Sequence, residues 1–75
     1  MEKVSDWLNR TELERFLKAK FYRIVDSNGM ELYDQLEARK CPQCWNVASI
    51  LGMVVTKVEE TKGYFLVTAV RTEDL

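Results

Sequence analysis

The clearest periodic pattern of apolar residues lies in the first third of the chain. Apolar side chains recur there at spacings of three, four and seven residues, as on one face of an α-helix: Leu13, Phe16, Leu17, Phe21 and Ile24. Thr11-Glu12-Leu13-Glu14 has the pattern of a capping box, in which the Thr11 hydroxyl accepts from a backbone amide and Glu14 reaches back. We therefore expect a helix from Thr11 to about Lys20, with the apolar face in the core. The two tryptophans, Trp7 and Trp45, are expected to anchor that core.

Residues 21–34 allow two interpretations. Residues 21–25 can extend the helix, in which case Asn28-Gly29 ends it and Asn28 with Glu31 caps a second one. Alternatively, Asn28-Gly29 is the turn of a β-hairpin whose returning strand begins at Met30. Acidic residues precede the basic pair Arg39-Lys40, as the dipole of a second helix favours. We prefer the helical interpretation.

The C-terminal half predicts a short helix and two strands. Pro42 suits a first helical position, Gly52 can end the helix, and its buried stripe is expected to be Cys44, Val47, Ala48 and Leu51. Residues 53–58 and 64–70 are β-branched and aromatic runs typical of strands, with a turn at 59–63. The 75 residues then form one α+β domain of about three helices followed by a C-terminal antiparallel β-hairpin. The alternative is α-ββ-α-ββ with a four-stranded antiparallel sheet.

Composition narrows the classes of function. Eleven basic and twelve acidic residues leave a net charge of -1, so the whole molecule has no general attraction to nucleic acid or anionic membrane. The chain has no His and no glycine-rich phosphate loop, which excludes most enzyme templates. The first residues lack the apolar run of a secretory signal, and no segment is apolar enough to span a membrane. We therefore expect a non-enzymatic, cytoplasmic protein without a membrane partner.

The segment from Cys41 to Thr56 contains no charged residue and holds both cysteines. Cys41-Pro42-Gln43-Cys44 resembles the Cys-Pro-X-Cys motif of glutaredoxins in these four residues only, which leaves thiol-redox or disulfide chemistry as one alternative. A second alternative is zinc bound across a homodimer by Cys41 and Cys44 of each chain, because one chain supplies only two of four ligands. We prefer a third, in which both thiols pack in the core without a cofactor.

The segment from Leu32 to Thr68 resembles the winged helix-turn-helix superfamily in the order and spacing of its elements. The resemblance rests on the turn, the packing positions of the third helix and the exit into the first wing strand: Leu36, Cys41-Pro42, Val47, Ile50, Leu51 and Gly52-Met53-Val54. It implies a winged-helix fold that binds DNA.

Candidate contacts follow from this interpretation and from the basic character of the first helix. Arg15, Lys18 and Tyr22 would share the face opposite the apolar stripe, and polar residues of the third helix could contact adenine edges. The candidate nucleic-acid or partner residues are Arg15, Lys18, Tyr22, Arg23, Gln43, Asn46, Lys57 and Lys62. For each of them the alternative is ordinary solvated surface or core.

Three functions are consistent with these patterns. The first is a small regulatory protein that acts on DNA or on the transcription apparatus. The second is a protein–protein interaction module that uses the uncharged Cys41–Thr56 surface, either as a monomer or as a homodimer. The third is a zinc-bridged or thiol-redox protein in which Cys41 and Cys44 carry the chemistry.

Overall fold

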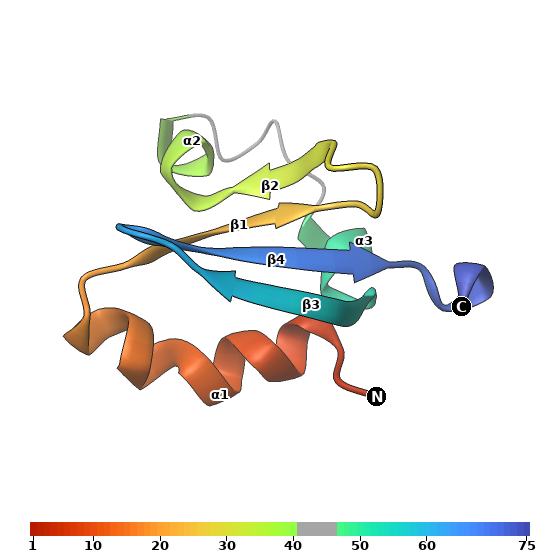
Figure 1. Ribbon diagram of the computed structural model, residues 1–75, viewed down its shortest axis with the longest axis horizontal. Helices are drawn as coiled ribbons and strands as arrows, with labels where there is room; N and C mark the ends of the chain where they lie inside the picture. Colours follow the sequence, from red (N-terminus) through yellow and green to blue (C-terminus); the bar gives the residue numbers. More distant parts are fainter. Residues whose placement is uncertain (41–46) are drawn as a thin grey trace.

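Four strands form one mixed sheet, and the helices pack beside it (Figure 1). The computed structural model describes residues 1–40 and 47–75. In chain order these residues form α1 (Val4–Leu17), β1 (Phe21–Val25), β2 (Glu31–Asp34), α2 (Gln35–Lys40), α3 (Val47–Leu51), β3 (Val54–Glu60), β4 (Tyr64–Val70) and the 3-10 helix η2 (Thr72–Asp74). The strand order is β2-β1-β4-β3, with β1 and β4 parallel and both outer pairs antiparallel. The expected α+β class is confirmed.

The preferred helical interpretation of residues 21–34 is wrong, because these residues form the β1–β2 hairpin. A carboxylate stabilises its turn: Asp26 Oδ1 accepts from the amides of Asn28 and Met30, both at 2.9 Å. Gly29 supplies the positive φ of 84° that the turn requires. The alternative with four strands is closer, but its all-antiparallel sheet is corrected by the parallel β1–β4 pair, and the winged-helix arrangement is not confirmed.

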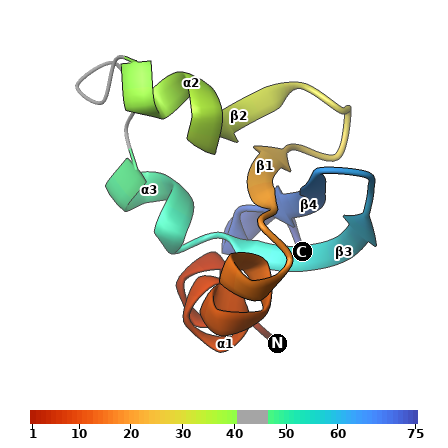
Figure 2. The same cartoon turned by 90° about the vertical axis from the view of Figure 1, so that its left-hand side faces the viewer.

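The core lies between one face of the sheet and the helices α1 and α3. Alternate residues of β4 are buried on this face, as the two-residue period of a strand requires. Figure 2 shows the helices on one side of the curved sheet, while no described helix covers the other side. The central cluster consists of Val4, Trp7, Ile24, Ile50, Phe65, Val67 and Ala69.

Helix α1 begins at Val4, so the predicted capping box at Thr11 is wrong. Thr11 is buried in the middle of the helix, where its hydroxyl donates to the carbonyl of Trp7 at 2.7 Å. The residues of α1 that face the core are Val4, Trp7 and Thr11, again at spacings of three and four. The expectation that Leu13, Phe16 and Leu17 form the core face is therefore wrong, since all three are exposed.

The end of α1 turns the chain sharply toward β1. The amide of Ala19 bonds the carbonyl of Phe16 at 3.1 Å, and the amide of Lys20 bonds that of Arg15 at 2.9 Å. This is the Schellman pattern, with Ala19 at a φ of 53° in the position usually held by glycine. The turn carries Phe21 back alongside the last part of α1.

The described part of the predicted third helix is α3, and the side of it that faces the core differs from the prediction. Ile50 is buried although the predicted stripe did not include it, and Ala48 is exposed although it was expected inside. The expected burial of Cys44 and Trp45 lies outside the described residues. The C-terminal strands lie antiparallel near the expected positions, and Gly63, at a φ of 102°, stands in the turn between them.

We predict that truncating a side chain on the inner face of α1 lowers the stability of the protein, whereas truncating one on the outer face hardly changes it. Trp7→Ala removes a side chain that is 1% exposed and should lower the free energy of unfolding by about 3–5 kcal/mol. Phe16→Ala removes one that is 79% exposed and should change it by no more than about 0.5 kcal/mol. Urea denaturation followed by circular dichroism measures both. An equal loss in the two variants would contradict the observed rotation of α1.

Candidate functional site

The face of α1 that points away from the sheet is apolar in its C-terminal half. Leu13, Phe16 and Leu17 are 68%, 79% and 72% exposed, and they lie on the side of the helix opposite Trp7. We call these three residues the α1 apolar face. Contiguous exposed apolar patches larger than a few hundred Å² commonly mark interaction sites. Isolated exposed apolar side chains are ordinary, but three adjacent ones at helical spacing form a surface.

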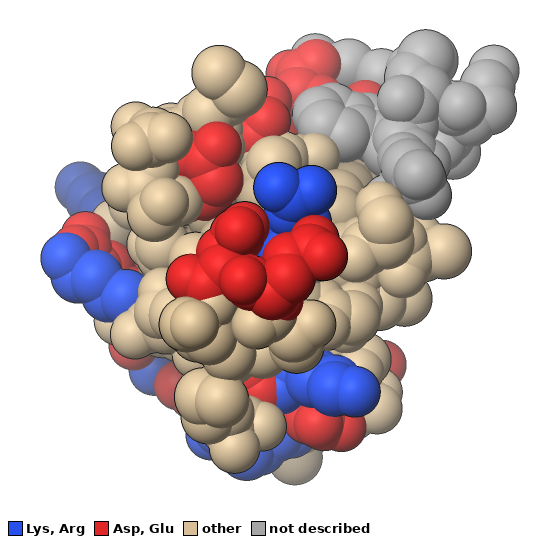
Figure 3. All heavy atoms as spheres, turned by 90° about the vertical axis from the view of Figure 1, so that its right-hand side faces the viewer, with Lys and Arg blue, Asp and Glu red and all other residues tan. Residues whose placement is uncertain are grey.

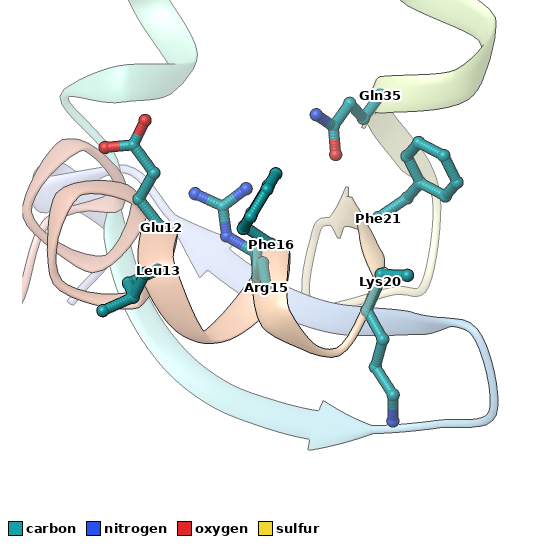
Figure 4. A pocket seen from close by; sticks show the side chains of 8 residues that line it. Glu12, Leu13, Arg15, Phe16, Lys20, Phe21 and Gln35 are labelled. Atoms are coloured by element: carbon teal, nitrogen blue, oxygen red, sulfur yellow. The ribbon is translucent and has the colours of Figure 1, made fainter.

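A groove adjoins the α1 apolar face. It has a volume of about 660 Å³ and lies between the end of α1 and the beginnings of β1 and α2. Figure 4 shows the Arg15 side chain extending from α1 toward the side from which Gln35 of α2 projects, while the Lys20 side chain points away. The lining residues are Glu12, Leu13, Arg15, Phe16, Ala19, Lys20, Phe21 and Gln35.

Arg15 is held in place by neutral neighbours. Its Nε donates to the Thr11 hydroxyl at 3.1 Å and its Nη2 to the carbonyl of Leu8 at 2.9 Å. The guanidinium carbon lies 5.0 Å from the ring centroid of Tyr22 and 5.6 Å from that of Trp7, within cation–π range. No carboxylate among residues 1–40 and 47–75 forms an ion pair with Arg15. Since a guanidinium has five N–H donors, donors remain for a bound group.

Two acceptors of the same groove also lack partners. The buried Oε1 of Gln35 receives no hydrogen bond. Glu12 is exposed and forms no ion pair within the described part of the chain. A buried acceptor without a donor is costly, and such atoms in native proteins call for an explanation. As far as the described residues show, the groove therefore combines apolar walls with one cation and two acceptors that lack partners.

Lys20 also lines the groove, but its ammonium is occupied elsewhere. It donates to Glu60 at 2.8 Å and to the carbonyl of Thr61 at 2.7 Å. Lys18 contacts the same carboxylate at 3.1 Å and Glu14 at 2.9 Å. The hydrogen bonds from Lys20 and Lys18 lower the pKa of Glu60, and those to Glu14 and Glu60 raise the pKa of Lys18. These pairs tie the end of α1 to the β3–β4 turn.

The predicted nucleic-acid residues are not gathered into one basic surface. Arg23 pairs with Glu31 at 2.6 Å and Asp34 at 3.3 Å, and Lys57 pairs with Glu59 at 2.6 Å. Lys62 is exposed in the β3–β4 turn. Of the expected common face of Arg15, Lys18 and Tyr22, the structure brings Arg15 and Tyr22 together, while Lys18 turns to Glu60. Gln43 and Asn46 lie outside the described residues.

The C-terminal end of the molecule likewise shows mixed charge. In Figure 3 acidic and basic side chains lie next to one another, and the visible face has no continuous basic patch. Arg71 pairs there with Glu73 at 3.4 Å and with Asp74 at 3.3 Å. Alternating charges of this kind are poorly suited to a phosphate backbone.

Two other expectations concern metal and membrane. Within the described ranges, no cluster of three or more metal-ligating side chains occurs. The candidate ligands Cys41 and Cys44 lie outside those ranges, so the zinc and redox alternatives stay predictions. No helix in the part of the chain that the structure describes has the length and apolar character needed to cross a bilayer.

Comparison with known proteins adds no relative: no family model, curated protein or solved structure matches the chain. The candidate site therefore rests on its own geometry. Of the groove residues, the sequence pattern predicts Arg15 as a binding residue but not Glu12 or Gln35. It also predicts that the α1 apolar face lies in the core. The signal that could have corrected this is the second stripe of Val4, Trp7 and Thr11 on the opposite side of the same helix.

Tyr22 connects the groove to the core. Its ring stacks on Tyr33 with centroids 5.6 Å apart and meets the edge of Trp7 at 6.2 Å. Burial, with a further contribution from the neighbouring Tyr33, raises the pKa of Tyr22 to about 12. The neutral phenol is therefore the form that the folded state favours.

We predict a corresponding loss of stability at high pH. Because the folded pKa is raised above the ordinary 10.0, the contribution of Tyr22 is fully present below pH 10 and is lost as pH rises through about 12. In an ultraviolet titration of tyrosinate, one of the three tyrosines should ionise late, and Tyr22→Phe should abolish that late step. The absence of a late step from the wild-type titration would show that Tyr22 is solvated.

Proposed function

We propose that this protein is a non-enzymatic protein–protein interaction module that binds its partner through the α1 apolar face and the adjoining groove. The observation that carries the proposal is the exposure of Leu13, Phe16 and Leu17, each by more than two thirds, on one side of one helix. A domain of 75 residues has a small core and little apolar surface to spare. Leaving three large apolar side chains in water is most readily explained by a partner that covers them.

The chemistry of the groove supports a protein partner. The centres of protein interfaces are enriched in aromatic residues and arginine, and this groove contains Phe16, Phe21 and Arg15. The aromatic rings beneath Arg15 hold its guanidinium in one place before binding, which reduces the entropy lost on association. Arg15 and Phe16 are thus suited to be the residues whose truncation costs the most binding energy.

The partner should present apolar side chains together with a carboxylate. The apolar side chains would cover Leu13, Phe16 and Leu17, while the carboxylate would pair with the free donors of Arg15. A hydrogen-bond donor beside it would satisfy Gln35 Oε1. A carboxylate held by a guanidinium in a partly desolvated groove gives a stronger bond than an exposed ion pair does.

A protein partner is favoured over DNA by the same arrangement. Lys18, Arg23 and Lys57 each have an acidic neighbour in contact, so a phosphate approaching them would meet negative charge as well. Action on DNA or the transcription apparatus through these residues stays a prediction. The earlier protein-binding surface, Cys41–Thr56, is replaced in this proposal, since Ile50 and Val54 of that segment are buried.

Site-directed photo-crosslinking in the native host tests the proposal. A benzophenone side chain placed at Leu17 should form covalent protein adducts, and adding Phe16→Glu to that variant should remove most of them. Met30 provides the matched control position, because it is 68% exposed but lies in the β1–β2 turn. Equal adduct yields at Leu17 and Met30, or adducts at Leu17 that persist with Phe16→Glu, would show that the α1 apolar face is not a binding surface.

A further inference from the structure

We infer that the partner covering the α1 apolar face is a second copy of this chain, with the two α1 helices packed antiparallel about a two-fold axis. This inference rests on the proposed function and identifies its partner. It is carried by the unpaired charges of the groove, by the position of the apolar residues on α1 and by the area that a stable dimer needs.

The charges of the groove are complementary to themselves. Glu12 has no cationic partner, Arg15 has no carboxylate partner among the described residues, and both line the same groove. The neighbouring charges are already paired, Lys18 with Glu14 and Lys20 with Glu60. In a two-fold dimer every contact occurs twice, so Glu12 of each copy can meet Arg15 of the other. One carboxylate and one guanidinium on each copy then satisfy both groups.

The apolar residues are arranged to fit the same symmetry. Antiparallel packing of two α1 helices sets Leu13 of one copy near Leu17 of the other and brings the two Phe16 rings close to the axis. The spacing of these residues, three and four along the helix, forms the ridges by which helices interdigitate. Glu12 and Arg15 line the groove together with Leu13 and Phe16, so their charges would lie beside the contact that the apolar residues make.

A dimer of small domains needs a contact that extends beyond the three apolar side chains. A standard interface covers about 800 Å² on each partner, roughly one sixth of the 5095 Å² surface of this chain. The α1 apolar face and the groove together run along the end of α1 and reach β1 and α2. Small domains often gain stability by oligomerisation, and a net charge of -1 produces little repulsion between two copies.

Analytical ultracentrifugation of the purified full chain tests the partner's identity. The wild type should sediment as a dimer, and the Phe16→Glu variant should sediment as a monomer. Circular dichroism should show that the variant is still folded. Met30→Glu introduces the same charge at another exposed apolar residue, away from α1, and should remain dimeric. A wild type that is still monomeric at about 1 mM overturns the inference, because a weak dimer would be half formed there. A dimer that Phe16→Glu leaves intact overturns it as well, since another surface then makes the contact.

A charge reversal tests the antiparallel arrangement. Glu12→Arg would place a cation against Arg15 of the second copy and should weaken the dimer about tenfold or more. Glu59→Arg makes the same change on β3 and should leave the dissociation constant within about twofold of the wild-type value. A dimer insensitive to Glu12→Arg overturns the arrangement. If the protein is monomeric but Leu17 crosslinks to a different protein in the host, the second-copy inference fails while the proposed function stands. If Leu17 forms no specific adduct, both fail.

Discussion

The burial of Trp7 against the sheet fixes the rotation of α1, and most features of the surface depend on that rotation. Trp7 is 1% exposed and meets the edges of Tyr22 and Phe65, which come from the two parallel strands. A helix that turns this side inward must turn the opposite side to solvent. The exposure of Leu13, Phe16 and Leu17 is thus a geometric consequence of the core.

Arg15 links the core to the groove. Its guanidinium rests on the rings of Trp7 and Tyr22 while its remaining donors are available on the side of Gln35. The aromatic rings that determine how α1 sits therefore also determine where the cation is presented. A binding group supported by the packed interior is positioned more accurately than one on a free loop.

The sequence predicted the positions of helices and strands better than it predicted which side of each helix is buried. The alternation in 64–70 and the periodicity in 11–17 are local signals, and both segments have the expected structure. The rotation of α1 could not be decided locally, because the apolar residues 13, 16 and 17 have the same helical spacing as 4, 7 and 11. Asn28-Gly29 suited both a helix end and a hairpin, and the pairing of residues 21–25 with β2 and β4 decided for the strand. The presence of Arg15 and Gln35 in one groove depends on the β1–β2 hairpin, which only the tertiary structure reveals.

The central place of β4 has a consequence for how the chain folds as it is synthesised. β4 lies between β1 and β3, yet it is made after both of them. Until it leaves the ribosome, Trp7 and Ile24 lack Phe65 and Val67, the neighbours they pack against. A nascent α1 then exposes apolar side chains all round, and pairing of distant strands is slow. The growing chain is consequently most prone to aggregate just before β4 emerges.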